Sequence, residues 1–153
     1  MRNFTALFLT CFLSLSGAAL AEQVTDNVDI VVYRSPTCGC CGKWLKHLKD
    51  NNFNVKDIVL DDVASVKERY GVPKELVSCH TAIVDGYIIE GHVPAGDIKT
   101  LLATKPQIAG ITVPGMPSGT PGMEMGERKD PYKVIAFDKE NRLQIFNSYG
   151  DEN

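Results

Sequence analysis

The sequence predicts one mixed α/β domain, in which helices lie on the faces of a mixed sheet and a β-hairpin is added at the C-terminus. Three observations predict this class. Strand-like and helix-like segments alternate in the first half of the chain, an Asp-Gly turn joins two β-rich segments in the middle, and another pair of β-rich segments follows near the end. The predicted order is βαβα, then ββα, then the added hairpin.

The first half of the chain is predicted to form two strand-helix pairs. Residues 28–33 are nearly all apolar or β-branched, which is typical of a strand covered on both faces. Apolar residues then recur with helical spacing over residues 41–48, and this predicts a helix whose buried stripe begins at a cysteine. Residues 53–60 are a second predicted strand. A short helix follows, with Asp61 as its predicted N-cap and Gly71 as its end.

The second half is predicted to begin with a tight hairpin. Asp85 and Gly86 lie between two β-rich segments of four residues each, which is a strong signal for a two-residue turn. A third helix is predicted to start at Pro94 and to stop before Pro106. The last hairpin is predicted within residues 134–146. This order of elements resembles the thioredoxin-like layout.

The first 21 residues are predicted to be a secretory signal peptide. Arg2 precedes an apolar run that ends in small residues, and cleavage is expected after Ala21. Residues 22–153 would then form the single domain. Ser and Gly interrupt the apolar run before it reaches the length of about 20 residues that a membrane span needs. We therefore expect export without stable membrane insertion after cleavage, and retention as an uncleaved anchor is the alternative interpretation.

The charge balance argues against several classes of partner. The chain has 16 Lys and Arg against 19 Asp and Glu, a formal net charge of −3. Without a basic excess there is no electrostatic reason to expect nucleic-acid binding or attachment to an anionic membrane surface. The sequence also has no recognisable Ser/His/Asp set, paired-carboxylate signature or glycine-rich phosphate loop.

Four cysteines would remain after cleavage: Cys38, Cys40, Cys41 and Cys79. In an oxidising compartment they would ordinarily form two structural disulfides. Cys38 and Cys41 also make a C-x-x-C pair at a helix N-terminus, where the helix dipole favours a thiolate, so a redox pair is a second hypothesis. In the thioredoxin-like layout, the loop with Cys79 and His80 meets this helix start. By that analogy, all four sulfurs are expected to converge at one end of the sheet.

Converging thiols favour several Cu(I) ions over one zinc ion. A single zinc is the default for four cysteines, but Cys40 and Cys41 are adjacent and would point about 100° apart on a helix. Such a pair is better suited to bridging between ions. Four thiolates around one monovalent ion would also leave a local charge of about −3, which is costly when partly buried. Several Cu(I) ions, the monovalent ion that thiolates and thioethers select, would cancel it.

A loop rich in Gly, Pro and Met occupies residues from about 105 to 130 and holds three of the four methionines, Met116, Met123 and Met125. Thioethers are soft ligands, so these three are candidate auxiliary ligands of copper. The alternative is that they pack the loop onto the domain.

The histidines carry weaker signals. His80 is a candidate auxiliary ligand because it follows Cys79, although adjacency also allows the two side chains to point in opposite directions. His47 lies about 10 Å along the helix from Cys40, so a solvated helix face is expected for it. His92 is interpreted as a residue of a helix start.

Four sequence blocks together resemble the CopG-type periplasmic copper-resistance family, whose domain was long labelled as of unknown function. The blocks are residues 38–44, 79–82, 90–95 and 113–117. The resemblance extends over residues 28–149. It implies a thioredoxin-like fold, cysteine-bridged binding of several coppers, and a role in surviving copper excess in the bacterial envelope. It implies no settled reaction.

The leading hypothesis is a periplasmic copper-binding protein for copper resistance or homeostasis. Its polynuclear Cu(I) site would be held by Cys38, Cys40, Cys41 and Cys79. The expected partners are copper ions and a periplasmic copper donor or acceptor protein. The alternative is a thiol-disulfide or copper oxidoreductase in which Cys38 attacks and Cys41 resolves. It is not preferred, because Cys40 is a surplus thiol beside that pair and His80 takes the place of the usual loop proline. A third hypothesis is a disulfide-stabilised domain that binds another partner.

Overall fold

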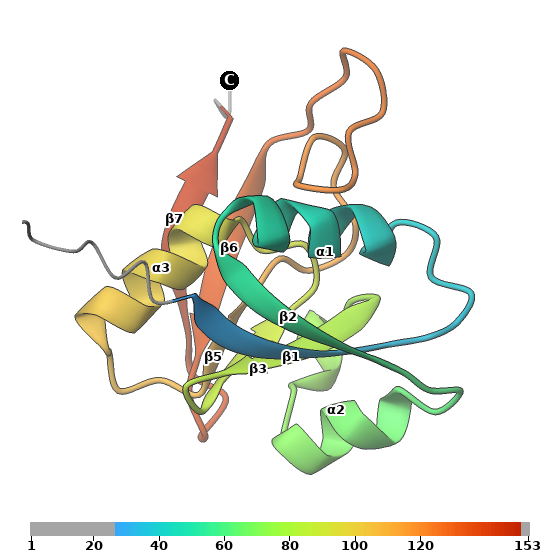
Figure 1. The fold of residues 1–153 in the computed structure, drawn as a ribbon. Helices are drawn as coiled ribbons and strands as arrows, with labels where there is room; N and C mark the ends of the chain where they lie inside the picture. The colour runs from blue at the N-terminus through green and yellow to red at the C-terminus, as the bar shows by residue number, and fades with distance from the viewer. Residues whose placement is uncertain (1–26, 151–153) are drawn as a thin grey trace, which may run out of the picture.

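A computed structural model of the chain describes residues 27–150, which form a seven-stranded mixed sheet with helices on both faces (Figure 1). The strand order is β2-β1-β3-β4-β5-β6-β7. Figure 1 shows α1 and α3 on one face and α2 on the other. The elements are β1 (Val28–Arg34), α1 (Cys41–Asp50), β2 (Phe53–Val59), α2 (Ala64–Tyr70), the 3₁₀ turn η1 (Lys74–Leu76), β3 (His80–Val84), β4 (Tyr87–Glu90), α3 (Ala95–Thr104), β5 (Gly110–Thr112), β6 (Tyr132–Phe137) and β7 (Leu143–Tyr149).

The predicted mixed α/β class is confirmed. Strand β1 pairs in parallel with β2 and antiparallel with β3, and the order βαβα-ββα is present in full. The thioredoxin-like label and the single domain over residues 22–153 stay predictions, and the predicted signal peptide lies outside the described residues. Within residues 27–150, no helix is long and apolar enough to cross a membrane.

The first helix packs as its spacing predicts. Cys41, Trp44, Leu45 and Leu48 are the buried residues of α1 and face the sheet. Trp44, Leu45 and Leu48 join Ile30 and Val32 of β1 in the main hydrophobic core between the sheet and α1 and α3. The helix stripe that packs the core thus starts at a cysteine, so the packing of α1 fixes the place of Cys41.

The tight hairpin between β3 and β4 is also confirmed. Asp85 and Gly86 have φ angles of +46° and +82°, the left-handed conformation that a type I′ turn requires at both central positions.

The predicted capping residue of α2, Asp61, is wrong. Asp62 rather than Asp61 accepts the hydrogen bond from the backbone N–H of Ser65, at 3.0 Å. Gly71 ends α2 in the left-handed conformation, as predicted.

Strand β5 was not predicted, and it changes how the last hairpin is attached. This three-residue strand pairs in parallel with β4 and antiparallel with β6, so the hairpin of β6 and β7 continues the main sheet. Its strand pattern is too short to detect, since three residues give almost no alternation. The Gly/Pro/Met-rich loop therefore begins after β5, later than the predicted start near residue 105.

His47 joins α1 to α3, which corrects the expectation of a solvated helix face. The backbone N–H of Ala95, the first residue of α3, donates a hydrogen bond to His47 Nε2 at 3.0 Å. The imidazole therefore accepts at Nε2 and carries its proton on Nδ1. Burial lowers the pKa of His47 from its ordinary value of 6.5.

Acidification is expected to destabilise the metal-free protein partly through His47. Because folding lowers the pKa of His47, the unfolded chain binds the proton first, and stability is lost as pH falls below about 6.5. The variant His47→Gln keeps an acceptor that does not titrate. The free energy of unfolding is measured in urea at about pH 7.5 and about pH 5.5 for both proteins. Its decrease between the two pH values should be smaller in the variant than in the wild type by about 0.5–1.5 kcal/mol, the contribution of one hydrogen bond. Equal losses in both proteins would contradict this role.

Candidate metal centre

The four cysteines lie together at one end of the sheet. Cys38 and Cys40 are in the turn after β1, Cys41 begins α1, and Cys79 directly precedes β3. Their Sγ atoms all lie within 4.8 Å of one another. The sheet explains this convergence, because β1 and β3 are antiparallel neighbours and the last residue of β1 is paired with the first residue of β3.

Two of these sulfurs are joined. Cys38 and Cys41 form a disulfide, with Cα atoms 5.5 Å apart, while Cys40 and Cys79 are free thiols. The Sγ atom of Cys40 lies 3.8 Å from that of Cys38. Cys41 is fully buried and the other three are partly exposed. Reduction of the disulfide would supply two further thiolates to the same place.

The expected divergence of Cys40 and Cys41 does not separate their sulfurs. Cys40 is the N-cap residue and precedes the first helical residue, and its Sγ atom belongs to the same set within 4.8 Å. Cysteine spacing alone therefore does not distinguish one bound ion from several.

The His80 side chain points into the cysteine site. Its Nδ1 atom lies 3.3 Å from Cys41 Sγ and 3.1 Å from Cys79 Sγ. The residue is fully buried, and the ring of Trp44 packs on it with the centroids 4.3 Å apart. Burial holds the pKa of His80 well below its ordinary range, so the imidazole is neutral. Its Nε2 atom is buried and has no hydrogen-bond partner among the described residues.

His92 is a site residue that the sequence interpretation missed. It is fully buried, and its Nε2 atom lies 3.2 Å from Cys79 Sγ. Its Nδ1 atom lies 2.8 Å from the carbonyl oxygen of Pro121. Since a carbonyl only accepts, Nδ1 carries the proton and Nε2 turns its lone pair toward the sulfur. Burial lowers the pKa of His92, which keeps this lone pair free.

The donor atoms form two sets that share one sulfur. The first set contains the four cysteine sulfurs, and the second contains Cys79 Sγ with nitrogens of His80 and His92. Within each set, all donor atoms lie within 4.8 Å of one another. Burial, and secondarily the neighbouring Cys40, raises the pKa of the Cys79 thiol to about 12. Without a cation, the shared sulfur is therefore a protonated thiol.

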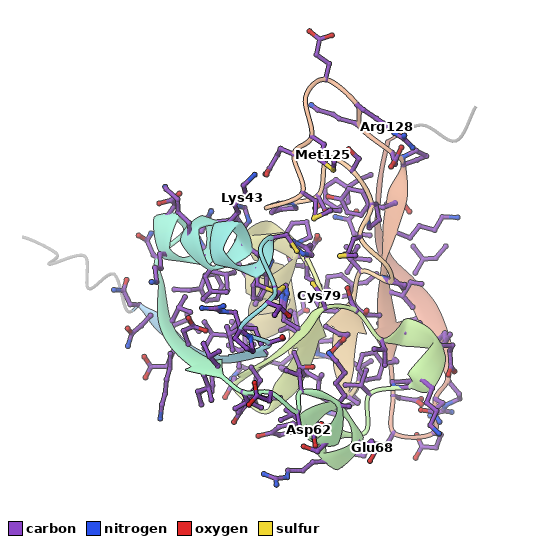
Figure 2. All side chains as sticks on the ribbon, turned by 90° about the vertical axis from the view of Figure 1, so that its right-hand side faces the viewer. Lys43, Asp62, Glu68, Cys79, Met125 and Arg128 are labelled. Atoms are coloured by element: carbon purple, nitrogen blue, oxygen red, sulfur yellow. A yellow bond between two sulfur atoms is a disulfide. The ribbon has the colours of Figure 1, made fainter. Side chains whose placement is uncertain are left out.

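The loop after β5 lies against the start of α1. A Cβ atom on Gly122 would come within 2.8 Å of the backbone nitrogen of Trp44, so the loop approaches the helix closely. Met123 is half-buried, whereas Met116 and Met125 are 54% and 67% exposed. Figure 2 shows Met125 on the projecting loop, apart from Cys79. An auxiliary-ligand role for the methionines stays a prediction.

Two solved structures are similar to this chain. They are named "Copper resistance protein copG- Form 1" and "Copper resistance protein copG- Form 2". Each is 44% identical, has a TM-score of 0.78, and matches over 82% of this chain and 100% of its own length. The chain belongs to the CopG copper-resistance family. A family described as "Protein of unknown function, DUF411" also matches, over residues 76–123, and no curated protein matches the chain.

In this CopG-family chain, a buried ion pair holds the segment that carries Cys79. Lys67 Nζ donates to Glu90 Oε1 at 2.7 Å and to Thr81 Oγ1 at 2.9 Å. The backbone N–H of Ser78 donates to the same carboxylate oxygen at 2.6 Å, and Thr81 Oγ1 donates to Glu90 Oε2 at 2.7 Å. Burial raises the pKa of Glu90, and Lys67 opposes that shift. The backbone of Ser78, the residue before Cys79, is thus held by the buried carboxylate of Glu90.

Gly91 is expected to be essential for the close approach of this segment. Its φ is +74°, and an added Cβ would lie 2.6 Å from Ser78 Oγ and 2.8 Å from the backbone oxygen of Val113. The variant Gly91→Ala is expected to cost about 1–2 kcal/mol for the left-handed conformation and about 1–3 kcal/mol more for the overlap. Gly115→Ala is the matched control, since Gly115 has φ +69° and no neighbour within 4 Å of the added Cβ. Equal decreases in the free energy of unfolding for Gly91→Ala and Gly115→Ala, measured in urea, would contradict the steric overlap at Gly91.

Proposed function

We propose that this chain is a periplasmic copper-binding protein whose four cysteines hold a polynuclear Cu(I) site. The observation that carries the proposal is the pair of donor sets that share Cys79 Sγ. One ion cannot use all six donors at once, because Zn²⁺ and similar ions take about four ligands in such sites. A sulfur that belongs to two sets is instead placed to bridge two ions.

The donor chemistry favours monovalent copper. Thiolates are the soft ligands that select Cu(I), and imidazole also suits copper. Both imidazoles are neutral, so the thiolates supply the negative charge that the ions must balance. Several monovalent cations balance four thiolates in a partly buried site, whereas one ion leaves most of the charge uncompensated. Full loading requires prior reduction of the Cys38–Cys41 disulfide.

The proposed role is copper resistance or homeostasis in the periplasm, in exchange with a copper donor or acceptor protein. Two observations support this role. The first 21 residues have the composition of a signal peptide that is cleaved after Ala21. The similar solved structures carry the name of a copper resistance protein.

An anaerobic titration of the fully reduced protein with Cu(I), followed by native mass spectrometry and thiol counting, tests the proposal. We expect more than one Cu(I) per chain and no remaining free thiol. One zinc ion retained in preference to copper would instead indicate a structural zinc site and contradict the proposal. So would a lack of affinity for either metal.

A second candidate function is thiol-disulfide or copper oxidoreduction through Cys38 and Cys41. The observation that favours it is the disulfide of these residues at the start of α1, where the helix dipole stabilises a thiolate. Rapid reduction of a model disulfide by the metal-free dithiol form, without metal affinity, would favour this function over the copper site.

A further inference from the structure

One of the two donor sets is independent of the disulfide. Cys79, His80 and His92 include neither Cys38 nor Cys41, so the set is complete in the disulfide form that the structure describes. We propose that these three residues form a mononuclear Cu(I) site that is available while Cys38 and Cys41 are joined. This inference rests on the proposed copper function and assigns a separate loading state to the same centre.

The three donor atoms are already close to a ligand arrangement. Cys79 Sγ lies 3.1 Å from His80 Nδ1 and 3.2 Å from His92 Nε2. With bonds of roughly 2.0–2.3 Å, ligands of one ion lie on the order of 3.6 Å apart. Each sulfur-nitrogen separation therefore has to widen by only about 0.4–0.5 Å to admit the ion.

His92 has the second hydrogen bond that is typical of a metal-binding histidine. Its Nδ1–H donates to the carbonyl oxygen of Pro121 at 2.8 Å, which fixes the tautomer and aims Nε2 at the sulfur. The Nδ1 atom of His80 faces Cys79 from β3. Its Nε2 atom is buried without a hydrogen-bond partner among the described residues. Both imidazoles can thus offer a lone pair to one ion.

Charge selects Cu(I) for this set. A histidine must be neutral to bind a metal ion, so the thiolate of Cys79 is the only charge that the three donors supply. One monovalent ion makes the set neutral, while a divalent ion leaves a positive charge in a buried place. On binding, the Cys79 S–H bond breaks, the Cu–S bond forms and the proton leaves to solvent. No electron is transferred, and the disulfide stays intact.

The site gives the protein two loading states. In the disulfide form it holds one Cu(I) ion at the three-residue set. After reduction, the remaining sulfurs complete the polynuclear site around the same Cys79. The number of bound ions then reports the redox state of Cys38 and Cys41.

The test is an anaerobic Cu(I) titration of the disulfide form against a chromogenic Cu(I) chelator, with native mass spectrometry to verify the disulfide and count the ions. We expect one Cu(I) per chain. His92→Ala and Cys79→Ser should each weaken binding by more than about 100-fold, since even outer partners of a metal site are worth about 10- to 100-fold. His47→Gln, a histidine change outside both donor sets, is the matched control and should leave the affinity unchanged. Cys79→Ser barely alters side-chain size, so it keeps the test valid if His92→Ala does not fold.

A variant without the disulfide provides an independent form of the same test. Cys38→Ser combined with Cys41→Ser removes both sulfurs, and one Cu(I) per chain is again expected. The inference is overturned if the disulfide form binds no Cu(I), or if Cys40→Ser weakens binding as much as Cys79→Ser, because the ion is then held by two sulfurs. If the reduced wild type binds several ions while the disulfide form binds none, only this inference fails. If the reduced protein binds none, the proposed function fails as well.

Discussion

Replacing Lys67 by methionine is expected to lower the free energy of unfolding by about 3–5 kcal/mol, because it leaves the buried Glu90 carboxylate without its ion-pair partner. The side chain of Glu90 is fully buried and that of Lys67 is 10% exposed. The carboxylate retains the hydrogen bonds from Ser78 and Thr81, which do not replace a positive charge. The loss is measured by urea unfolding of the metal-free protein.

The exposed ion pair of Lys46 and Asp50 provides a matched control. It has the same N–O distance of 2.7 Å, but its side chains are 75% and 57% exposed. Lys46→Met is expected to cost less than about 1 kcal/mol. The double variant Lys67→Met with Glu90→Gln removes both buried charges and should recover much of the loss. A cost for Lys67→Met no larger than that of Lys46→Met would rule out the buried pair as a major source of stability.

The cost of Lys67→Met should also depend on pH. Burial already raises the pKa of Glu90 above its ordinary value of 4.5, and removal of Lys67 takes away the charge that opposes this shift. A carboxyl group whose pKa is raised by folding binds its proton first in the folded state, so the folded state gains stability as pH falls. The difference in the free energy of unfolding between the wild type and Lys67→Met should therefore be largest at neutral pH and become smaller as the pH approaches 4.5.

Local patterns predicted the elements that carry the first three cysteines and the central hairpin. The buried stripe that begins at Cys41 follows directly from helical spacing, and the turn at Asp85 and Gly86 follows from its dipeptide. The approach of Cys79 to the other cysteines needed the order of strands as well. It could be anticipated because that order brings the end of β1 beside the start of β3.

His92 could have been found from the hairpin. In a two-residue turn the register is fixed, and here Thr81 pairs with Glu90. Two residues farther from the turn on each side of the hairpin, the same register places His92 opposite Cys79. Interpretation of His92 as a helix start considered only the proline that follows it and overlooked this cross-strand relation.

The buried ion pair had no comparable signal. Lys67 lies on a seven-residue helix with other charged residues, a pattern that predicts a solvated face. Its partner Glu90 is 23 residues away, on β4. Only the packing of α2 over the sheet brings the two together, and a single sequence does not encode that packing as a local pattern.

Cys79→Ser is expected to remove more copper from the fully reduced protein than any other single cysteine change. Cys79 Sγ belongs to both donor sets, whereas Cys40 Sγ belongs to one. Without Cys79, the three remaining sulfurs and the two imidazoles no longer have a common bridging atom. We expect an affinity loss of more than about 100-fold, larger than for changes in the groups that hydrogen-bond to metal ligands.

Cys40→Ser is the matched comparison for Cys79→Ser, because both residues are partly exposed free thiols in the structure. In Cys40→Ser, Cys79 can still bridge the imidazoles to Cys38 and Cys41, so a larger share of the Cu(I) should be retained. Neither change touches the C-x-x-C pair, and reduction of a model disulfide by Cys38 and Cys41 should survive in both variants. Native mass spectrometry at equal Cu(I) supply distinguishes the outcomes. Equal copper loss in the two variants would contradict the role of Cys79 as the shared ligand, because Cys79 Sγ belongs to both donor sets and Cys40 Sγ to only one.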